Sequence, residues 1–497
     1  MTEIDTRPAW LKLASEIRFR TEAFIGGEYV AAASGETFPS INPATGELLA
    51  EVSSCDSVDV DAAVRSARAS FEKGDWSRAA PVRRKETLLR LADLLETHKE
   101  ELALTDSLDM GKLVSAAVTA DVPHTIGVMN WYAEAIDKIY GEIAPAAQGE
   151  LGLVSREPVG VVAAVVPWNF PLAMAAWKVA PALAAGNSVI LKPAEQSPLS
   201  ALRLGELAVE AGIPHGVLNV VPGFGDRAGQ ALGRHPDVDC VSFTGSTEVG
   251  KLFLRYSAES NMKQVWLECG GKSPNLVFAD AEEMSAAAEG TCASIFNNQG
   301  EVCSAHSRLL VAAEIADAFL EELIPAARKY HPGDPLEPSS TLGALVDEHH
   351  TQHVMAYIED GKHAGELLLG GRRVDVNGTG CFVEPTIFAK VPLEHSMIRE
   401  EIFGPVLNVM TFATEDEAVE RANDSRYGLS ASVWTQNIST ALRVASRLRA
   451  GAVSVNAVDV VNIGTPFGGV KESGFGRDLS LHALEKYTSH KTTWIRY

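Results

Sequence analysis

The sequence predicts an α/β protein with two parallel β-sheets covered by helices. Short apolar runs rich in β-branched residues alternate with longer helical stretches, which is typical of parallel strands buried on both faces. This alternation occurs once before Pro274 and again after it. A chain of 497 residues is also long enough for two or three domains. We therefore expect two α/β domains, joined near Glu268 to Gly271.

The first part of the chain precedes this alternation. Residues 20–55 predict short strands, with a turn at Asn42-Pro43-Ala44-Thr45-Gly46. From Val58 to about Lys138 the apolar residues recur at helical spacing, as Leu88, Leu91 and Leu95 do. Residues 140–156 mix polar and apolar side chains and predict strands.

The expected parallel strands follow in two groups. The first group is Val161–Val166, Ser188–Leu191, Val217–Val221, Cys240–Phe243 and Gln264–Leu267. The second group is Asn275–Phe278, Arg308–Val311, Leu407–Phe412, Leu429–Trp434 and Ala452–Val455, and the tail Thr488–Tyr497 predicts a terminal strand. The first group ends in small, polar and charged residues. Because parallel sheets bind ligands at the carboxyl ends of their strands, we expect a binding site at that edge.

Composition excludes several classes of partner. The chain has 65 Asp and Glu against 43 Lys and Arg, a net charge of −22, which disfavours nucleic acid and anionic membranes. Its six cysteines lack metal-ligand or disulfide spacing, which predicts reduced thiols, no metal site and a cytoplasmic location. The longest apolar stretch, 160–186, is broken by prolines and by Asn169 and Lys178, so it predicts a strand, loop and helix rather than a membrane span.

Cys303 is a candidate nucleophile. It follows Gly300, whose backbone freedom suits a close approach to a substrate, and Glu268 could act as its base. Asn169 could donate to an oxyanion. Each residue also has a simpler interpretation, since a lone cysteine usually packs inertly in a core and Asn169 could cap a helix that begins near Pro171.

A second set of residues suits a dinucleotide. Glu195, close to Lys192 after a predicted strand, could accept hydrogen bonds from ribose hydroxyls and repel a 2′-phosphate. The alternative is a surface ion pair. Gly245 and Ser246 open a predicted helix whose backbone N–H groups suit a pyrophosphate. Gly223, Gly225 and Gly229 do not form the G-x-G-x-x-G fingerprint, so tight turns are their simpler explanation. Glu401 could bind a second ribose or end a surface helix.

Taken together, these motifs resemble the NAD(P)-dependent aldehyde dehydrogenase superfamily. The resemblance rests on Leu267-Glu268-x-Gly270-Gly271-Lys272-Ser273-Pro274 followed by Phe296-x-Asn298-x-Gly300-x-x-Cys303. It continues through the segments 167–171, 192–195, 243–247, 401–406 and 466–474, in the order in which the family has them. The resemblance covers nearly the whole chain and implies a Rossmann-like cofactor domain, a second α/β catalytic domain and a small β extension.

The resemblance implies a role for each site residue. Cys303 would attack an aldehyde, Asn169 would hold the oxyanion, and Glu268 would activate the water that hydrolyses the thioester to a free acid. Lys192 joins these three in the catalytic set. NAD is the expected cofactor, with NADP less favoured. The expected cofactor contacts are Val166, Pro167, Trp168, Lys192, Glu195, Gly225, Gly229, Phe243, Gly245, Ser246, Val249, Glu268, Glu401 and Phe403.

The substrate expectation also comes from the resemblance. Within the family the chain is most similar to bacterial aminoaldehyde dehydrogenases of the γ-glutamyl-γ-aminobutyraldehyde type. The expected substrate contacts are Asp109, Phe170, Met174, Trp177, Phe296, Val302, Ser304, Asp459 and Phe467. Asp109 would face a cationic amine. The loop at residues 456–465 lacks the aromatic and Gly-Asp features of that subgroup, so a broad-range aliphatic or aromatic aldehyde dehydrogenase is the alternative.

The resemblance also implies domain boundaries and an assembly. Residues 1–139 and 159–270 would bind NAD, residues 271–486 would form the catalytic domain, and residues 140–158 with 487–497 would form an oligomerisation extension. We expect a homodimer or homotetramer, with no membrane or nucleic-acid partner. Two other interpretations stay open: a thiol esterase or acyltransferase that uses Cys303 without redox chemistry, and a binding protein that kept the fold without activity.

Overall fold

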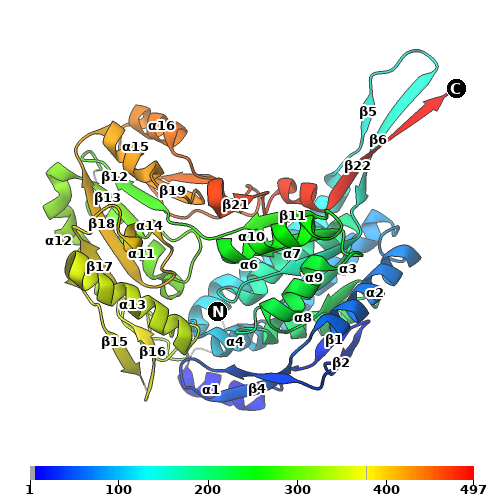
Figure 1. Ribbon diagram of the computed structural model, residues 1–497, viewed down its shortest axis with the longest axis horizontal. Coiled ribbons are helices and arrows are strands. Elements are labelled where there is room, and N and C mark those ends of the chain that lie inside the picture. The colour runs from blue at the N-terminus through cyan, green and yellow to red at the C-terminus, as the bar shows by residue number, and fades with distance from the viewer. Residues whose placement is uncertain (1–5, 282, 377) are drawn as a thin grey trace.

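The computed structural model describes residues 6–281, 283–376 and 378–497, which form two large sheets with helices packed around them (Figure 1). The first sheet has eight strands in the order β2-β1-β9-β8-β7-β10-β11-β21. These strands are β1 (Ala23–Ile25), β2 (Glu28–Val30), β7 (Val161–Val165), β8 (Ser188–Lys192), β9 (Leu218–Val220), β10 (Cys240–Thr244), β11 (Gln264–Glu268) and β21 (Gly474–Phe475). Strands β7 to β11 run parallel, whereas β1, β2 and β21 pair antiparallel.

Helices bury both faces of the parallel strands. Along β7, Val162 and Ala164 belong to one apolar cluster, and Val161, Ala163 and Val165 belong to another, as the two-residue period of a strand requires. The first cluster includes side chains of α3 (Pro81–Thr97), α4 (Lys99–Met110), α6 (Val122–Ala135), α7 (Pro171–Ala185) and α8 (Leu199–Glu210). The second includes α2 (Ser57–Lys73), α9 (Gln230–Arg234) and α10 (Thr247–Ala258).

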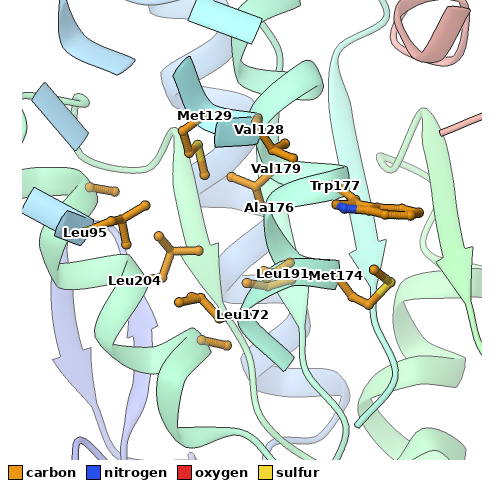
Figure 2. Close-up of a cluster of buried hydrophobic side chains, with 14 of the residues drawn as sticks. Leu95, Val128, Met129, Leu172, Met174, Ala176, Trp177, Val179, Leu191 and Leu204 are labelled. Atoms are coloured by element: carbon orange, nitrogen blue, oxygen red, sulfur yellow. The ribbon is translucent and has the colours of Figure 1, made fainter. Parts of the chain in front are cut away.

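Helix α7 belongs to the core and also lines a large cavity. Figure 2 shows Leu95, Leu172 and Leu204 clustered on one side of this helix, whereas Met174 and Trp177 project from the other side. All five side chains are buried. The same helix can therefore pack into the core and line the cavity, because its apolar residues lie all around its axis.

The second sheet has seven strands in the order β14-β17-β18-β13-β12-β19-β20. They are β12 (Pro274–Val277), β13 (Arg308–Ala312), β14 (Glu366–Leu369), β17 (Thr386–Ala389), β18 (Val406–Phe412), β19 (Ser430–Trp434) and β20 (Ala452–Val455), all parallel except β14. The helices around this sheet are α11 (Met284–Phe296), α12 (Ala316–Ala327), α13 (Glu348–Ala364), α14 (Ser396–Arg399), α15 (Glu415–Asn423) and α16 (Ile438–Arg447).

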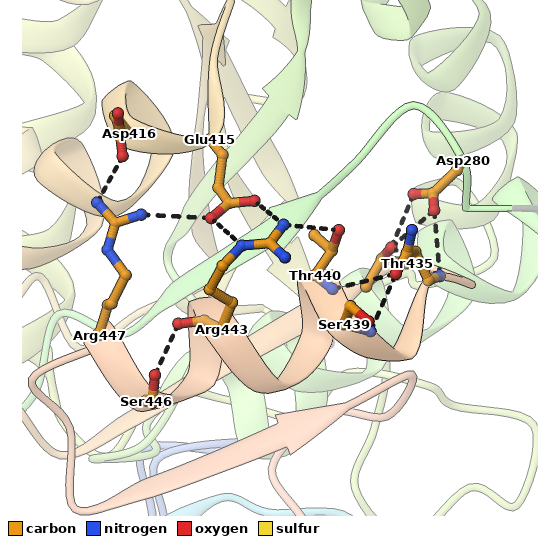
Figure 3. A network of polar contacts seen from close by, with 10 residues as sticks. Asp280, Glu415, Asp416, Thr435, Ser439, Thr440, Arg443, Ser446 and Arg447 are labelled. Carbon is orange, nitrogen blue, oxygen red and sulfur yellow. Dashed lines mark hydrogen bonds and ion pairs between the residues drawn. The ribbon is translucent and has the colours of Figure 1, made fainter.

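Ion pairs at the surface connect α15 to α16 (Figure 3). Arg443 donates from Nε and Nη2 to the two carboxylate oxygens of Glu415, at 2.9 and 2.6 Å. Arg447, one turn further along α16, contacts Asp416 at 2.7 Å. Both acids lie in the first turn of α15, where the helix dipole favours negative charge. Exposed pairs of this kind contribute at most about 1 kcal/mol each.

A three-stranded sheet projects from the body of the molecule (Figure 1). It consists of β5 (Glu142–Ala144), β6 (Glu150–Pro158) and β22 (Thr488–Arg496), in the order β22-β6-β5. Large apolar side chains on this arm remain exposed, including Ile143 at 72% and Trp494 at 58%. The two segments expected to form an extension thus pair with each other, although more than 300 residues separate them.

The remaining elements are small. They are α1 (Arg7–Glu16), β3 (Thr37–Ile41), β4 (Leu48–Ser53), α5 (Val114–Ala116), β15 (Arg373–Val376) and β16 (Thr379–Val383), together with the short helical turns η1 (Ala117–Asp121), η2 (Ile136–Lys138), η3 (Gly225–Gly229), η4 (Asn297–Gly300), η5 (Ala313–Ile315), η6 (Lys471–Ser473) and η7 (Leu481–Lys486). The predicted turn at 42–46 joins β3 to β4. Among the described residues, every helix is too short or too polar to cross a bilayer.

The predicted fold class is confirmed, and the predicted parallel strands differ from the observed ones by no more than one residue at either end. One detail differs from the expected division. The range 271–486 contains β21, yet β21 pairs with β11 and so extends the first sheet. After the second sheet is complete, the chain therefore returns to the first.

Candidate active site

A cavity of about 730 Å³ lies at the carboxyl ends of the first sheet's strands and also contacts loops of the second. Because β7, β8, β10 and β11 run parallel, the segments that follow them emerge at one edge. The predicted site residues that line this cavity are Pro167, Trp168, Asn169, Phe170, Met174, Trp177, Gly245, Ser246, Glu268, Val302, Cys303, Ser304, Glu401, Phe403, Asp459 and Phe467. Residues far apart in the sequence thus meet in one place.

The other predicted cofactor residues lie outside the lining of this cavity. Val166 directly follows β7, and Phe243 is a buried residue of β10. Gly225 and Gly229 follow β9, and a Cβ atom built on either glycine would have no neighbour within 4 Å, so there is open space beside them. Val249 lies on the first turn of α10, 38% exposed. These residues lie in or follow strands of the same sheet edge as the cavity but are not part of its lining.

Lys192 and Glu195 also follow this edge. The Nζ atom of Lys192 lies 3.1 Å from Oε2 of Glu195, so the ion-pair interpretation holds. Lys192 is buried, whereas the Glu195 side chain is 32% exposed. The pair is compatible with ribose binding, because a carboxylate fixed by a lysine keeps acceptor lone pairs for hydroxyl groups.

Two expected substrate residues do not reach the cavity, and both expectations are corrected. The carboxylate of Asp109 is 1% exposed and accepts hydrogen bonds from Ser40 Oγ at 2.6 Å and from the Leu199 N–H at 2.9 Å. Phe296 is fully buried against Tyr330, with ring centroids 5.4 Å apart. Its neighbour Asn297 lines the cavity instead. Phe296 shares the buried face of α11 with Cys292, four residues earlier, and this spacing was visible in the sequence.

The loop that carries Cys303 is held by close backbone contacts. Gly300 has φ +76°, and a Cβ atom there would lie 2.2 Å from the Gly404 carbonyl oxygen. A Cβ atom on Gly271 would lie 2.4 Å from the backbone oxygen of Cys303. Only glycine fits at either position. The segment that follows Glu268 therefore packs directly against the loop that carries Cys303.

Burial controls the ionisation of Cys303 and Glu268. It raises the pKa of Glu268 to about 8, aided by the nearby Asp478, while Lys178 and Lys486 oppose the shift. Burial also raises the pKa of the Cys303 thiol well above its usual range, and the charges of Glu268 and Asp459 add to this effect. Oε1 of Glu268 has no hydrogen-bond partner among the described residues. At neutral pH both groups are mostly protonated.

Asn169 is held in the wall of the cavity. Its Nδ2 donates to the backbone oxygen of Glu301 at 2.8 Å, and its own backbone oxygen accepts from Asn298 Nδ2 at 2.9 Å and Lys112 Nζ at 3.2 Å. The alternative role as a helix cap is wrong, because α7 begins at Pro171 after Phe170 and has no side-chain cap. The Asn169 amide retains one N–H for a ligand.

Glu401 also faces the cavity rather than ending a surface helix. Its Oε1 accepts a hydrogen bond of 2.9 Å from the Gly271 N–H. A Cβ atom on Gly270 would come within 2.0 Å of its Oε2, so the carboxylate lies on the backbone next to Glu268. Burial raises the pKa of Glu401 to about 7, and the Gly271 N–H and Lys272 partly oppose this.

Several cavity residues were missed by sequence reasoning. His350 hydrogen-bonds through Nε2 to the Phe403 backbone oxygen at 2.7 Å and packs against Trp168, with centroids 5.3 Å apart. His124 accepts a hydrogen bond of 2.8 Å from Trp177 Nε1. His353, three residues after His350 on α13, lines the cavity too. That helical spacing was the available signal, but nothing in the sequence placed α13 beside Trp168.

Asp459 lies close to Cys303 and contacts the following residue, Ser304. Its Oδ2 accepts a hydrogen bond of 2.7 Å from Ser304 Oγ, and its backbone is left-handed, with φ +44°. Burial raises its pKa, whereas the Ser304 hydrogen bond lowers it. The Asp459 carboxylate, a predicted substrate contact, therefore hydrogen-bonds the residue that follows Cys303 and lines the cavity, whereas that of Asp109 does not.

Comparison with known proteins identifies the family. A family model described as "Aldehyde dehydrogenase family" matches residues 29–493. The chain belongs to the aldehyde dehydrogenase family. This confirms the predicted recognition, fold and enzyme class.

The relatives of this aldehyde dehydrogenase are similar over their full lengths. The NADP/NAD-dependent aldehyde dehydrogenase PuuC of Escherichia coli is 53% identical over 486 residues, which is 98% of each chain. Aminoacetaldehyde dehydrogenase of Pseudomonas aeruginosa is 50% identical over 496 residues, which is 100% of this chain and 99% of that one. One similar solved structure is that of a mutant of P. syringae indole-3-acetaldehyde dehydrogenase in complex with NAD+ and IAA. It has a TM-score of 0.98 at 53% identity, covering 99% of this chain and 100% of that chain.

Proposed function

We propose that this aldehyde dehydrogenase oxidises an aldehyde to the free carboxylic acid with NAD+, using Cys303 as nucleophile and Glu268 as base. The observation that supports this is the shared cavity: Cys303, Glu268 and Asn169 come from three segments and line one space. A thioesterase would need no dinucleotide site, whereas Glu195 and the start of α10 at Gly245 and Ser246 lie along the same sheet edge and suit one.

The mechanism follows from these positions. Cys303 Sγ transfers its proton to the Glu268 carboxylate, which releases it to solvent, and the thiolate attacks the aldehyde carbon. The remaining N–H of the Asn169 amide stabilises the oxyanion with the Cys303 backbone N–H. Glu401 and Phe403 would hold the nicotinamide of NAD+ beside Cys303, where it would supply the acceptor for the hydride that leaves this carbon. The resulting thioester on Cys303 is attacked by a water whose proton passes to Glu268, and Cys303 leaves as thiolate with release of the acid. A carboxyl group of raised pKa suits a base that works near pH 8.

Glu195 is the basis for the proposed cofactor preference. Its carboxylate, paired with Lys192, would accept hydrogen bonds from the adenosine ribose and repel a 2′-phosphate. NAD+ is therefore favoured over NADP+. Because Glu195 is partly exposed, solvent screens this repulsion, and NADP+ is expected to be used weakly rather than excluded. Glu401 and Phe403 would contact the nicotinamide half.

We propose an amine-bearing aldehyde as substrate. Asp459 supports this, because its carboxylate lies beside Ser304 and can pair with a cationic amine. The names of two relatives point the same way, aminoacetaldehyde dehydrogenase and γ-glutamyl-γ-aminobutyraldehyde dehydrogenase of Burkholderia cenocepacia, a solved structure 53% identical. A second candidate is an aromatic aldehyde, favoured by Trp177 and Phe467, whose ring centroids lie 5.2 Å apart in the cavity wall.

The test is NADH formation over a panel of short aliphatic, aromatic, ω-amino and γ-glutamylated aldehydes, each with NAD+ and with NADP+. Cys303→Ala must lose all turnover, and ω-amino aldehydes must give the highest kcat/KM. Highest kcat/KM for the aromatic aldehydes would favour the second candidate. No reduction with any aldehyde, by folded protein that binds NAD+, would overturn the proposal.

We also propose a homodimer or homotetramer assembled through the arm, in a cytoplasmic location. Exposed apolar residues on β22 and the free edges of the three-stranded sheet support assembly. All six cysteines are free, which suits a reducing compartment. Trp494→Lys is expected to shift the sedimentation coefficient toward a smaller species. An unchanged oligomer would show that assembly uses another surface.

A further inference from the structure

A second cavity of about 330 Å³ lies beside the catalytic loop, and the proposed mechanism does not use it. Asn297 and Asp459 line this cavity and also the main one. These two side chains therefore form a partition between the two spaces. A substrate whose aldehyde reaches Cys303 could extend past Asp459 into the second cavity. The volume lies at the lower end of the range for ligand pockets.

The second cavity suits hydrogen-bond donors and positive charge. Its polar side chains are amides, such as Asn298, hydroxyl groups from Ser294, Tyr330 and Thr341, and the carboxylate of Asp459. Its described lining contains no Lys, Arg or His. A ligand carboxylate would find no cation here, whereas a ligand ammonium would find one carboxylate and several oxygen acceptors. The cavity therefore selects for amines.

Hydrogen bonds hold the wall of the cavity in place. Asn298 is nine-tenths buried, and its Nδ2 donates to the backbone oxygens of Asn169 and Glu301. Its Oδ1 and the Nε2 of the neighbouring Gln299 have no hydrogen-bond partner among the described residues, so the lining holds one unused acceptor and one unused donor, and Asp459 supplies its only charge. Ser294 Oγ is hydrogen-bonded to His306, to Nδ1 at 2.7 Å and to the backbone N–H at 3.1 Å. Asn298 and Ser294 are therefore held in position by contacts within the protein.

We propose that the second cavity is a subsite for the distal amine of an extended aldehyde, one that carries a further amine beyond the reach of the main cavity. Asp459 contacts the chain where it passes between the cavities. The inference rests on the proposed aldehyde oxidation and makes it more specific. Aldehydes derived from polyamines fit both cavities. γ-Glutamylated aldehydes fit less well, because their carboxylate has no cationic partner in the subsite.

A variant at Ala293 tests the subsite. Ala293 is an exposed residue of α11 that lines only the second cavity, so Ala293→Phe fills that space without touching the main one. Ser285→Phe, exposed on the same helix and outside both cavities, is the matched control. The substrates are hexanal, an ω-aminoaldehyde with one amine, and its N-aminopropyl derivative with two.

The expected result is a KM for the diamine aldehyde at least tenfold higher in Ala293→Phe than in wild type. Hexanal should keep its kcat/KM within about twofold, and Ser285→Phe should match wild type with all three substrates. If Ala293→Phe lowered kcat/KM equally for hexanal and the diamine aldehyde, or lowered it for neither, the proposed subsite would be overturned.

Binding of spermidine separates this inference from the proposed function, because spermidine has amines but no aldehyde. Calorimetry at moderate salt should show spermidine binding to wild type and to Ser285→Phe, and at least tenfold weaker binding to Ala293→Phe. Equal binding by all three proteins would overturn the subsite even if aldehydes are oxidised. If only Ala293→Phe lost spermidine binding, the cavity's preference for amines would be upheld. If the wild-type protein also oxidised no aldehyde, the proposed reaction would be rejected while the amine site remained.

Discussion

Asn169 Nδ2 donates a hydrogen bond of 2.8 Å to the backbone oxygen of Glu301, two residues before Cys303. Asn169 follows β7 of the first sheet, and Glu301 belongs to the loop that precedes β13 of the second. One hydrogen bond therefore sets the position of the proposed oxyanion donor relative to the proposed nucleophile. The same bond joins the part of the chain that would bind the cofactor to the part that would bind the aldehyde.

Replacement of Asn169 should lower kcat strongly. Asn169→Asp has nearly the same shape but cannot donate, and loss of one oxyanion donor costs about 100- to 1000-fold in kcat. The dissociation constant for NAD+ should change little. Steady-state kinetics and a cofactor titration check both quantities. A kcat within fivefold of wild type would show that the backbone donors suffice.

Activity should rise with pH through about pH 8. The pKa of Glu268 is raised to about 8, so at pH 6 the carboxyl group is protonated and cannot accept a proton from water. Each unit of pH below 8 should lower the hydrolysis rate about tenfold, if this step limits turnover. The measurement is kcat between pH 6 and pH 9.

Glu268→Gln is the matching control for this pH dependence. The variant should release one NADH per active site in a burst and then stall, because the thioester forms but is not hydrolysed. Rapid mixing with absorbance detection measures the burst, and mass spectrometry detects the acyl-enzyme. Continued turnover with the wild-type pH profile would assign the base to another residue.

Glu195→Gln should relax the cofactor preference. Removing the negative charge removes repulsion of the 2′-phosphate and leaves the side-chain shape intact, so kcat/KM with NADP+ should rise about tenfold. Glu210→Gln, an exposed change at the end of α8, controls for net charge. The ratio of kcat/KM for the two cofactors is the quantity to compare. An unchanged ratio would place the ribose elsewhere.

Asp478 should be essential to stability. It lies 2% exposed between the ammonium groups of Lys178 and Lys486, which are also buried. Asp478→Ala leaves two buried cations without a counter-ion, and breaking such a cluster costs roughly 3–5 kcal/mol. Urea unfolding measures the loss. The triple variant Lys178→Met, Lys486→Met and Asp478→Leu should recover most of the lost unfolding free energy, because it removes all three charges of this buried cluster.

Much of the fold could be predicted because its signals are local. The apolar runs from Val161 to Glu268 and from Pro274 to Val455 contain their own strand signals, and their order in the chain implies parallel sheets. Cys303, Glu268 and Asn169 were identifiable because each belongs to a motif of adjacent residues. Gly300 was singled out for the backbone freedom that its φ of +76° requires.

The sequence alone determined the family, the two sheets and the sheet edge at which the cavity lies, since these depend on periodicity and on short motifs. Only the tertiary structure decided which side chains face the cavity. In the structure Phe296 lies in the core and Asn297 lines the cavity. The Asp109 carboxylate accepts a hydrogen bond from Ser40, and Asp459 contacts Ser304, 155 residues away in the sequence. Such contacts form when segments far apart in the sequence pack together, and a local sequence pattern does not show which distant segments will be in contact.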